Sequence, residues 1–256
     1  MAFKKDTVAG TMVFIIILSL VCSFMITGTV EILKERKLAK KREEVQQYVL
    51  KAADIDISQG DFSELFTQRV QPKMVNLATG KVTEKANLLD FDERMAAINP
   101  ETSTKPKKDI AKIKTMATDI RIFEVYDTKG QLASIVMPIY GKGLWSIIYG
   151  YMAIKPDLNT IENIVFYEHG ETPGIADFIT DPQWLALWQG KTLFDAKGNI
   201  AIKVIKGGAK DGDIHGIDGV SGATRSGVGI QRLVEFWFGV EGYQTYLHTL
   251  AAAEDK

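Results

Sequence analysis

The pattern of apolar and charged positions divides the chain into an N-terminal anchor and a larger domain. Residues 11–30 carry no charge, and this length matches the roughly 30 Å hydrocarbon core of a bilayer at about 1.5 Å per residue. A cleaved signal peptide has a shorter apolar region, about 7–15 residues, and a small-residue cleavage site. The pattern therefore predicts one uncleaved transmembrane helix over residues 11–30, preceded by an N-terminal tail of residues 1–10.

Residues 31–53 favour a continuous helix, because they are rich in Lys, Glu, Gln and Leu. Apolar positions are sparse at first and denser over the last two turns, as expected of a solvated stalk whose end packs on a folded domain. The basic residues of this stalk either face solvent or contact anionic lipid headgroups. Membrane lipid is therefore an expected partner.

Residues 54–256 show the patterns of both strands and helices. Residues 120–126 and 131–140 flank a turn at residues 127–130, which predicts an antiparallel hairpin. Further strands are expected at residues 143–153, 160–168 and 201–205, and short helices at residues 171–179 and 182–188. The polar, mixed region 54–119 is expected to elaborate the same domain, with a helix starting near residue 61.

Helical spacing of apolar side chains returns over residues 227–252, where Gly239 and Gly242 can divide the helix in two. Taken together, the patterns predict an α+β fold. It consists of a single N-terminal transmembrane helix and one domain, residues 54–256, of antiparallel strands and flanking helices.

Composition narrows the chemistry that this domain can perform. The formal net charge of −1 argues against a nucleic-acid-binding protein, which is typically strongly basic. The one cysteine, Cys22, cannot form an internal disulfide, a CxxC centre or an iron–sulfur cluster within the chain. The three histidines lack metal-ligand spacing, so no metal site is predicted. Redox chemistry here would require an organic cofactor or a centre shared with a partner.

The stretch from Asp218 to Thr224 is the strongest chemical signal. Gly222 permits a turn with positive φ, Ser221 can cap a helix or bind a phosphate oxygen, and Ala223 leaves room for a bulky group. A helix pattern begins just behind, and the N-terminus of a helix favours phosphate. Asp218 can orient the loop or hold a divalent ion. The alternative is a glycine-rich loop that only caps the C-terminal helix.

This stretch resembles the Asp-x-x-(Ser/Thr)-Gly-Ala-Thr signature of the family that carries FMN esterified to the last threonine, and Ser226 is the family's usual hydroxyl residue two places later. Residues 141–145, 149–151 and 168–174, together with Lys206, resemble one branch of this family, the C subunits of the sodium-translocating NADH:quinone reductases. The resemblance covers essentially the whole chain.

The resemblance implies one FMN per chain, linked through its phosphate to Thr224 by a separate flavin transferase. It also implies cofactor contacts, with Ile175 standing where the family usually has leucine and Lys206 able to stabilise a negative charge on a reduced flavin. Each contact residue has a plainer reading, as core packing, a turn or a surface lysine. The implied contacts are Leu144, Trp145, Glu171, Thr172, Ile175, Lys206, Ser221, Gly222 and Ala223.

The implied function is that of an electron-transfer subunit of a membrane respiratory complex. The chain would relay electrons from NADH-derived centres towards a membrane flavin and quinone, coupled by the complex to sodium export. Gly227 and Gly229 are followed by Arg232 where a dinucleotide fingerprint requires glycine, so the chain itself is not expected to oxidise NADH. Its partners would be the other subunits and, during maturation, the flavin transferase.

Two alternatives to this function remain. One is the flavin subunit of a ferredoxin–NAD electron-transport complex, and the other is a membrane-tethered binding module without a cofactor. Orientation is a separate question, because the basic residues that follow the span would place the domain in the cytoplasm, although long domains translocate largely regardless of such charges. The resemblance instead implies a single-pass protein of the bacterial inner membrane, with the tail of residues 1–10 in the cytoplasm and the domain on the periplasmic side.

Overall fold

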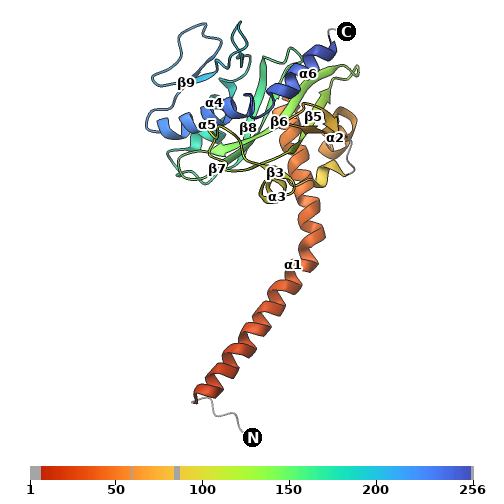
Figure 1. Ribbon diagram of the computed structural model, residues 1–256, viewed down its shortest axis with the longest axis vertical. Helices are drawn as coiled ribbons and strands as arrows, with labels where there is room; N and C mark the ends of the chain where they lie inside the picture. The colour runs from red at the N-terminus through yellow and green to blue at the C-terminus, as the bar shows by residue number, and fades with distance from the viewer. Residues whose placement is uncertain (1–6, 59, 84–86, 255–256) are drawn as a thin grey trace. The chain divides into compact units, whose positions relative to one another are not determined.

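The computed structural model describes residues 7–58, 60–83 and 87–254 (Figure 1). The chain forms two compact units, Met1–Glu44 and Val45–Lys256. Most of the predicted tail, residues 1–6, lies outside the described residues.

The first long element is the helix α1 (Val8–Ala52). Its apolar part has a mean hydropathy of 2.5 over 18 residues with almost no burial, which makes it a candidate membrane span by length and composition. The predicted span and the predicted stalk are thus parts of one helix. Neither Gly28 nor Thr29 interrupts it, and the Thr29 hydroxyl donates a hydrogen bond to the Met25 carbonyl one turn earlier.

A six-stranded antiparallel sheet organises the larger unit, in the order β2-β1-β5-β6-β7-β8. The predicted hairpin is present as β5 and β6, with Phe123 opposite Val136. A parallel pair, β9 with β10, and a short antiparallel pair, β3 with β4, lie outside this sheet. The strands are β1 (Val70–Asn76), β2 (Val82–Thr83), β3 (Ser103–Thr104), β4 (Met116–Ala117), β5 (Asp119–Tyr126), β6 (Leu132–Lys142), β7 (Ile147–Ile154), β8 (Ile161–Glu168), β9 (Lys203–Ile205) and β10 (Gly216–Asp218).

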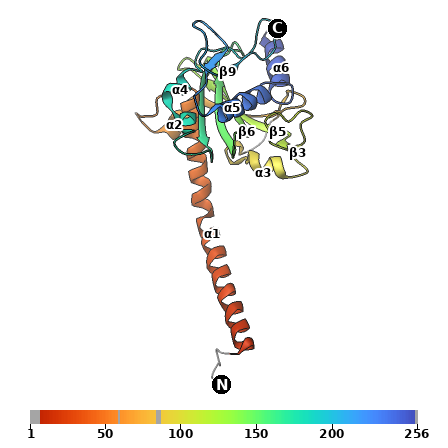
Figure 2. The same ribbon diagram turned by 90° about the vertical axis from the view of Figure 1, so that its left-hand side faces the viewer.

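Each face of the sheet carries its own apolar core, because neighbouring side chains along a strand point to opposite faces. One face packs against α5 (Thr224–Trp237) and α6 (Gln244–Glu254), which lie together in Figures 1 and 2. The other face packs against the last turns of α1 and against α2 (Phe62–Arg69). The α+β fold with antiparallel strands and flanking helices is therefore confirmed.

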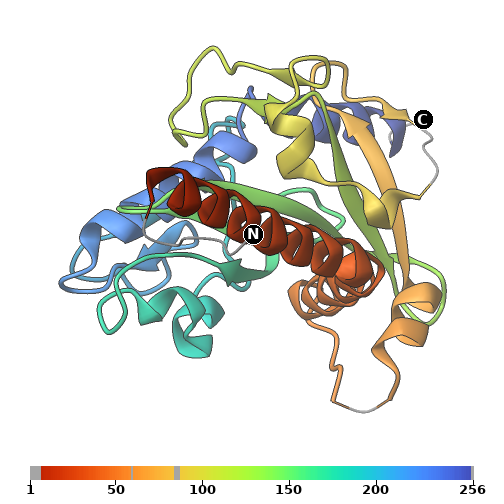
Figure 3. The same cartoon turned by 90° about the horizontal axis from the view of Figure 1, so that it is seen from below.

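A short excursion between β2 and β3 is held to the sheet by arginines. It contains η1 (Leu88–Asp90) and α3 (Glu93–Ile98), the yellow helix in Figure 3. The buried Arg121 donates hydrogen bonds to the carbonyls of Leu88 and Leu89 and pairs with Glu93 at 2.9 Å. Arg94 on α3 makes two hydrogen bonds to Glu168 at the end of β8.

Several element boundaries differ from the sequence expectation. β7 begins at Ile147 rather than at residue 143. The expected helix at residues 171–179 is instead a turn followed by the 3₁₀ helix η2 (Asp177–Thr180), because Pro173 and the positive φ of Gly174 interrupt helical geometry. The expected helix at 182–188 is shorter, α4 (Pro182–Ala186). The C-terminal helical region begins at Thr224, and it divides between Trp237 and Gln244.

The strand β1 is not expected from the sequence, because the region 54–119 reads as polar and contains Pro72. The register explains how this strand accommodates proline. β2 pairs only with Met74 and Val75, so β1 is an edge strand at Pro72, where a missing N–H costs the sheet no hydrogen bond on that side.

Candidate functional site

The loop from Asp218 to Thr224 connects β10 to the N-terminus of α5. Gly222 has φ +85°, and Thr224 is the first residue of the helix. The N-cap is Ala223, and no side chain caps the helix there. The backbone N–H groups of the first turn and the exposed Thr224 hydroxyl therefore remain available to a ligand. Such a terminus suits an anion.

Asp218 makes two hydrogen bonds that hold this loop in place. Its carboxylate accepts a hydrogen bond from the Ala209 N–H at 2.6 Å, and its carbonyl accepts one from the indole of the buried Trp184 at 2.8 Å. The first bond joins the turn after β9 to the loop before α5, and the second joins α4 to the same loop. Asp218 is thus tied to both the turn after β9 and α4.

Lys206 follows β9 and reaches the same loop through its backbone. The Gly219 N–H donates to the Ile205 carbonyl at 2.9 Å, and a β-carbon at Gly219 would lie 3.5 Å from the α-carbon of Lys206. Lys206 is exposed. Its positive charge is therefore carried at the edge of the loop that leads to Thr224.

Glu171 is the second organising residue of the site, and it is only 4% exposed. Its carboxylate accepts hydrogen bonds from the N–H groups of Leu144, Trp145 and Ser146 at 2.9–3.0 Å. It also accepts one from the Ser226 hydroxyl on α5 at 2.7 Å. One carboxylate therefore ties the loop between β6 and β7 to the first turn of α5.

These donors change the acidity of Glu171. Burial alone would raise its pKa, but the hydrogen bonds from Ser146, Ser226, Trp145 and Leu144 favour the charged form and lower the pKa from 4.5 to about 2. The carboxylate is thus ionised at every physiological pH. Its oxygens are occupied by protein donors, which indicates a role in positioning the loop.

Close backbone packing brings α5 to this loop. A β-carbon at Gly229 would lie 2.8 Å from the Gly143 α-carbon and 2.9 Å from the Lys142 carbonyl oxygen. A β-carbon at Gly143 would lie 2.8 Å from the Glu171 carboxylate. Both positions therefore require glycine, because a side chain at Gly229 would separate α5 from the loop and one at Gly143 would displace Glu171.

Apolar side chains stand exposed around this network. Trp145 is 68% exposed and Ile175 is 55% exposed, although both are large hydrophobic residues. Leu144 is half-buried beside Trp145, and Thr172 is exposed at the start of the turn that carries Ile175. Exposed apolar side chains next to a polar loop are typical of a binding surface.

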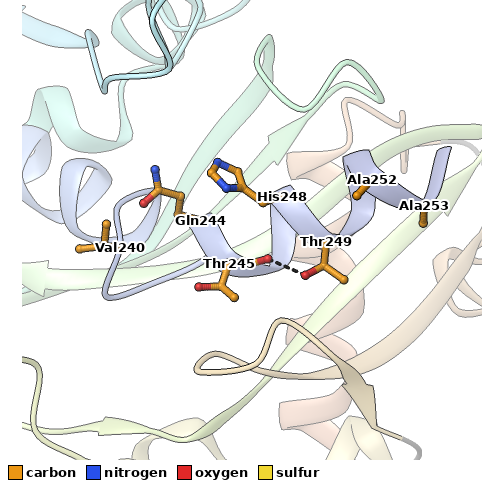
Figure 4. Close-up of a pocket in the computed structure, with 7 residues that line it drawn as sticks. All are labelled: Val240, Gln244, Thr245, His248, Thr249, Ala252 and Ala253. Carbon is orange, nitrogen blue, oxygen red and sulfur yellow. Dashed lines mark hydrogen bonds between the residues drawn. The ribbon is translucent and has the colours of Figure 1, made fainter. Parts of the chain in front are cut away.

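A groove of 780 Å³ along α6 is a separate feature (Figure 4). It contains none of the predicted site residues, and no lysine or arginine lines it, so it offers no positive charge to a phosphate. Among the residues that the structure describes, no group of three His, Cys, Asp or Glu side chains is placed to hold a metal ion. The groove is lined by Val240, Gln244, Thr245, His248, Thr249, Ala252 and Ala253.

Comparison with known proteins assigns the chain to a family. The FMN-binding domain family matches residues 143–239. The C subunit of the Na(+)-translocating NADH-quinone reductase of Neisseria meningitidis serogroup A is 38% identical over 253 residues, which covers 98% of this chain and 97% of that protein. The chain belongs to the family of Na(+)-translocating NADH-quinone reductase C subunits. The protein of the same name from Haemophilus ducreyi is 37% identical and covers 96% of this chain and 95% of its own length.

Solved structures of this family support the fold. The crystal structure of Shewanella oneidensis NqrC is 64% identical, with a TM-score of 0.82 over 84% of this chain and 99% of that one. The C subunit from Parabacteroides distasonis is 23% identical with a TM-score of 0.64 over 83% of this chain and 94% of that one, and it supports the fold alone.

The FMN-binding domain match covers the segment that holds the candidate site. The matched FMN-binding segment begins at Gly143, the glycine that contacts Gly229, and it ends just after α5. Every site residue predicted from the sequence, from Leu144 to Ser226, falls inside this segment. The structure brings Leu144, Trp145, Glu171 and Ser226 together directly.

Sequence reasoning missed Ser146, which belongs to the network around Glu171, and it did not consider Arg225. Ser146 donates to Glu171 and accepts a hydrogen bond from the Gly170 N–H at 2.8 Å, so it joins the two loops. Arg225 is exposed directly after Thr224. Its position in the first turn of a helix that follows a glycine turn is a signal that the sequence offers for a positive charge near a helix N-terminus.

Proposed function

We propose that this chain is the FMN-carrying electron-transfer subunit of a Na(+)-translocating NADH:quinone reductase, with FMN joined by a phosphoester to Thr224. The observation that carries the proposal is the exposed Thr224 hydroxyl at the uncapped N-terminus of α5, inside a matched FMN-binding domain. The residues around it fit the group.

The phosphate fits the first turn of α5. The free N–H groups and the helix dipole favour negative charge there, and Arg225 adds a positive side chain. Gly222 leaves open space, since a β-carbon at that position would meet nothing within 4 Å. A phosphoester at Thr224 therefore requires no rearrangement of the loop, and a covalent tether would prevent loss of the cofactor.

The ring system fits the exposed apolar surface. Trp145, Leu144 and Ile175 would pack against the isoalloxazine and exclude water from it. Lys206 would stabilise negative charge on the reduced ring by Coulomb attraction. Glu171 would act through the backbone of residues 144–146, whose N–H groups it fixes.

FMN, when bound, exchanges one or two electrons and so can connect one-electron and two-electron centres. The chain would receive electrons of NADH origin from one subunit and pass them towards a membrane flavin and quinone in another. A single span without charged residues offers no path for sodium, so ion transport would reside in partner subunits. Relatives are named as subunits of such a reductase, which favours this complex over the ferredoxin–NAD type.

The decisive experiment produces the full chain together with its flavin transferase. The wild-type protein should give a fluorescent band on a denaturing gel, and its intact mass should exceed the chain mass by one FMN less one water. Thr224→Val should lose both signals. Thr67→Val, which removes an exposed helical hydroxyl on α2, should keep them. A dark wild-type band with active transferase present would support a cofactor-free binding module instead.

We also propose that α1 crosses the inner membrane once and that the domain lies in the periplasm. Alkaline phosphatase fused after Lys256 should be active in intact cells. Fluorescence from a reporter that matures only in the cytoplasm would show the opposite orientation.

A further inference from the structure

A lysine-rich loop lies outside the predicted flavin contacts. Residues 105–114, called here the lysine loop, hold five lysines and one acidic residue, Asp109. The chain as a whole has a net charge of −1, so this is a strong local excess of positive charge. All five side chains are exposed: Lys105, Lys107, Lys108, Lys112 and Lys114.

Hydrogen bonds within the lysine loop and to Glu241, which lies outside it, hold the backbone of the loop in place. The Asp109 carboxylate accepts from the N–H groups of Ile113 and Lys114 at 2.9 and 2.8 Å. The Glu241 carboxylate accepts from the N–H groups of Lys107 and Lys108 at 3.0 and 3.3 Å. These two carboxylates offset part of the charge, but both are directed to the backbone, so the ammonium groups remain at the surface.

The backbone of the loop is also strained. Lys112 and Lys114 have φ values of +54° and +69°, which non-glycine residues rarely adopt. Such strain costs on the order of 1 kcal/mol or more per residue and persists only where the surroundings enforce it. The lysines are thus presented on a defined surface.

This surface borders the flavin site. The Lys142 N–H donates to the Ala111 carbonyl at 2.8 Å, and a β-carbon at Gly141 would lie 3.2 Å from the Ala111 β-carbon. Lys142 is itself exposed and directly precedes the loop that carries Trp145. The lysine loop therefore packs beside the strand end that leads into the cofactor region.

We propose that the lysine loop and Lys142 form the docking surface for an acidic face of the redox protein or subunit that exchanges electrons with this chain. The proposal rests on the proposed flavin function. Opposite charges around a redox site guide two proteins into contact and raise association rates by about 10–10³. Electron-transfer contacts are typically small, so a few charges at the rim of the site suffice to orient them.

Zero-length carbodiimide cross-linking of the assembled membrane complex tests the docking directly. An amide forms between a lysine amine and a contacting carboxylate, with loss of water, and peptide mass spectrometry identifies both residues. We expect links from Lys107, Lys108 or Lys112 to aspartates or glutamates of another subunit. This readout does not depend on the flavin, so it separates failure of docking from failure of the proposed function.

A matched pair of variants tests the consequence for electron transfer. Lys107→Gln/Lys108→Gln/Lys112→Gln should slow NADH-driven quinone reduction at low salt on the order of tenfold and flatten its salt dependence. Lys81→Gln/Lys129→Gln/Lys197→Gln, which removes three exposed lysines elsewhere, should leave both unchanged. In-gel flavin fluorescence should be equal in the two variants.

Two outcomes would overturn the proposal. Unchanged turnover together with an absence of links from the lysine loop would show that no partner docks there. Binding of the purified full chain to vesicles containing anionic phospholipid, lost in the loop variant while inter-subunit links are absent, would assign the loop to a membrane surface instead.

Discussion

Glu171 shows how a single buried carboxylate can join two segments of the candidate site. Its carboxylate accepts hydrogen bonds from the N–H groups of residues 144–146 and from the hydroxyl of Ser226. The positions of two segments far apart in sequence therefore depend on this one charged group. Hydrogen bonds to a charged acceptor contribute about 1.5–3 kcal/mol each, and losing the acceptor would leave buried donors unsatisfied. Its contribution should therefore appear in both stability and pH dependence.

Glu171→Gln should lower the free energy of unfolding by about 3 kcal/mol at pH 7. The folded-state pKa is depressed from 4.5 to about 2, so the ionised carboxylate contributes its full stabilisation above pH 4.5 and loses it as pH falls towards 2. The difference between variant and wild type should therefore shrink over this range. Urea unfolding of the detergent-solubilised chain, followed by tryptophan fluorescence at pH 7 and pH 3, measures it.

Glu168→Gln serves as the comparison. Its partner Arg94 is half exposed, and such surface pairs contribute about 1 kcal/mol or less. A loss for Glu171→Gln no larger than that for Glu168→Gln would contradict the positioning role.

Trp145→Ala should reduce electron transfer without removing the flavin. The Trp145 residue is 68% exposed, and the N–H that it donates to Glu171 belongs to the backbone, which alanine keeps. Band intensity in a denaturing gel should stay at the wild-type level, while quinone reduction slows. Complete loss of the covalent flavin would contradict this division of roles.

The helix α5 carries the site because close packing at glycine lets it approach the sheet. Gly229 contacts the backbone of Lys142 and Gly143, whereas Gly227 faces only the methyl group of Val204 at 3.3 Å. Backbone cannot yield as a flexible side chain can, so the two positions should respond differently to the same added methyl group.

Gly229→Ala should destabilise the protein by about 1–3 kcal/mol, because the new methyl group would force α5 away from the loop. Gly227→Ala should be close to neutral, since the gain in helix propensity of about 1 kcal/mol offsets the tight contact. Thermal unfolding and yield of covalent flavin measure both. Equal effects of the two substitutions would argue against the close approach.

The elements with a clear local pattern could be predicted, and those fixed by distant partners could not. The hairpin of β5 and β6 and the division of the C-terminal helix follow from alternation and glycine placement. The sequence predicts a strand at residues 143–146, where the structure has a loop. The apolar side chains there favour a strand, and nothing local in the sequence indicates that the backbone N–H groups of residues 144–146 donate to Glu171. The strand β1 could not be predicted, because a strand accepts a proline at position 72 only where no neighbouring strand needs its N–H, and this depends on where β2 ends. At the site, Thr224 could be singled out from its motif, whereas the role of Ser146 depends on its hydrogen bond to Glu171, 25 positions away.

At the scale of the whole molecule, the last turns of α1 belong to the core of the larger unit. Val45, Val49 and Leu50 are buried against Phe66 and Phe123. The division between the compact units falls at Glu44 and Val45, ahead of these side chains. The helix therefore serves one unit as a candidate span and the other as a structural element.

A chain that starts at Val45 should fold, whereas one that starts at Asp54 should be much less stable. Fully burying a Val or Leu side chain contributes about 1.5–3 kcal/mol, and the shorter chain loses Val49 and Leu50. Urea unfolding of both soluble chains measures the difference. Equal midpoints would show that the sheet does not need the end of α1.

The exposure of Trp145 also gives the protein an optical reporter. The chain has four tryptophans, and Trp184, Trp188 and Trp237 are buried. Iodide ions in solution can collide with the indole at position 145 and cannot reach the other three. Emission that iodide quenches would thus come from the rim of the site, and a docked protein or an overlying ring would shield it. Occupancy of this surface can then be followed in real time without any label.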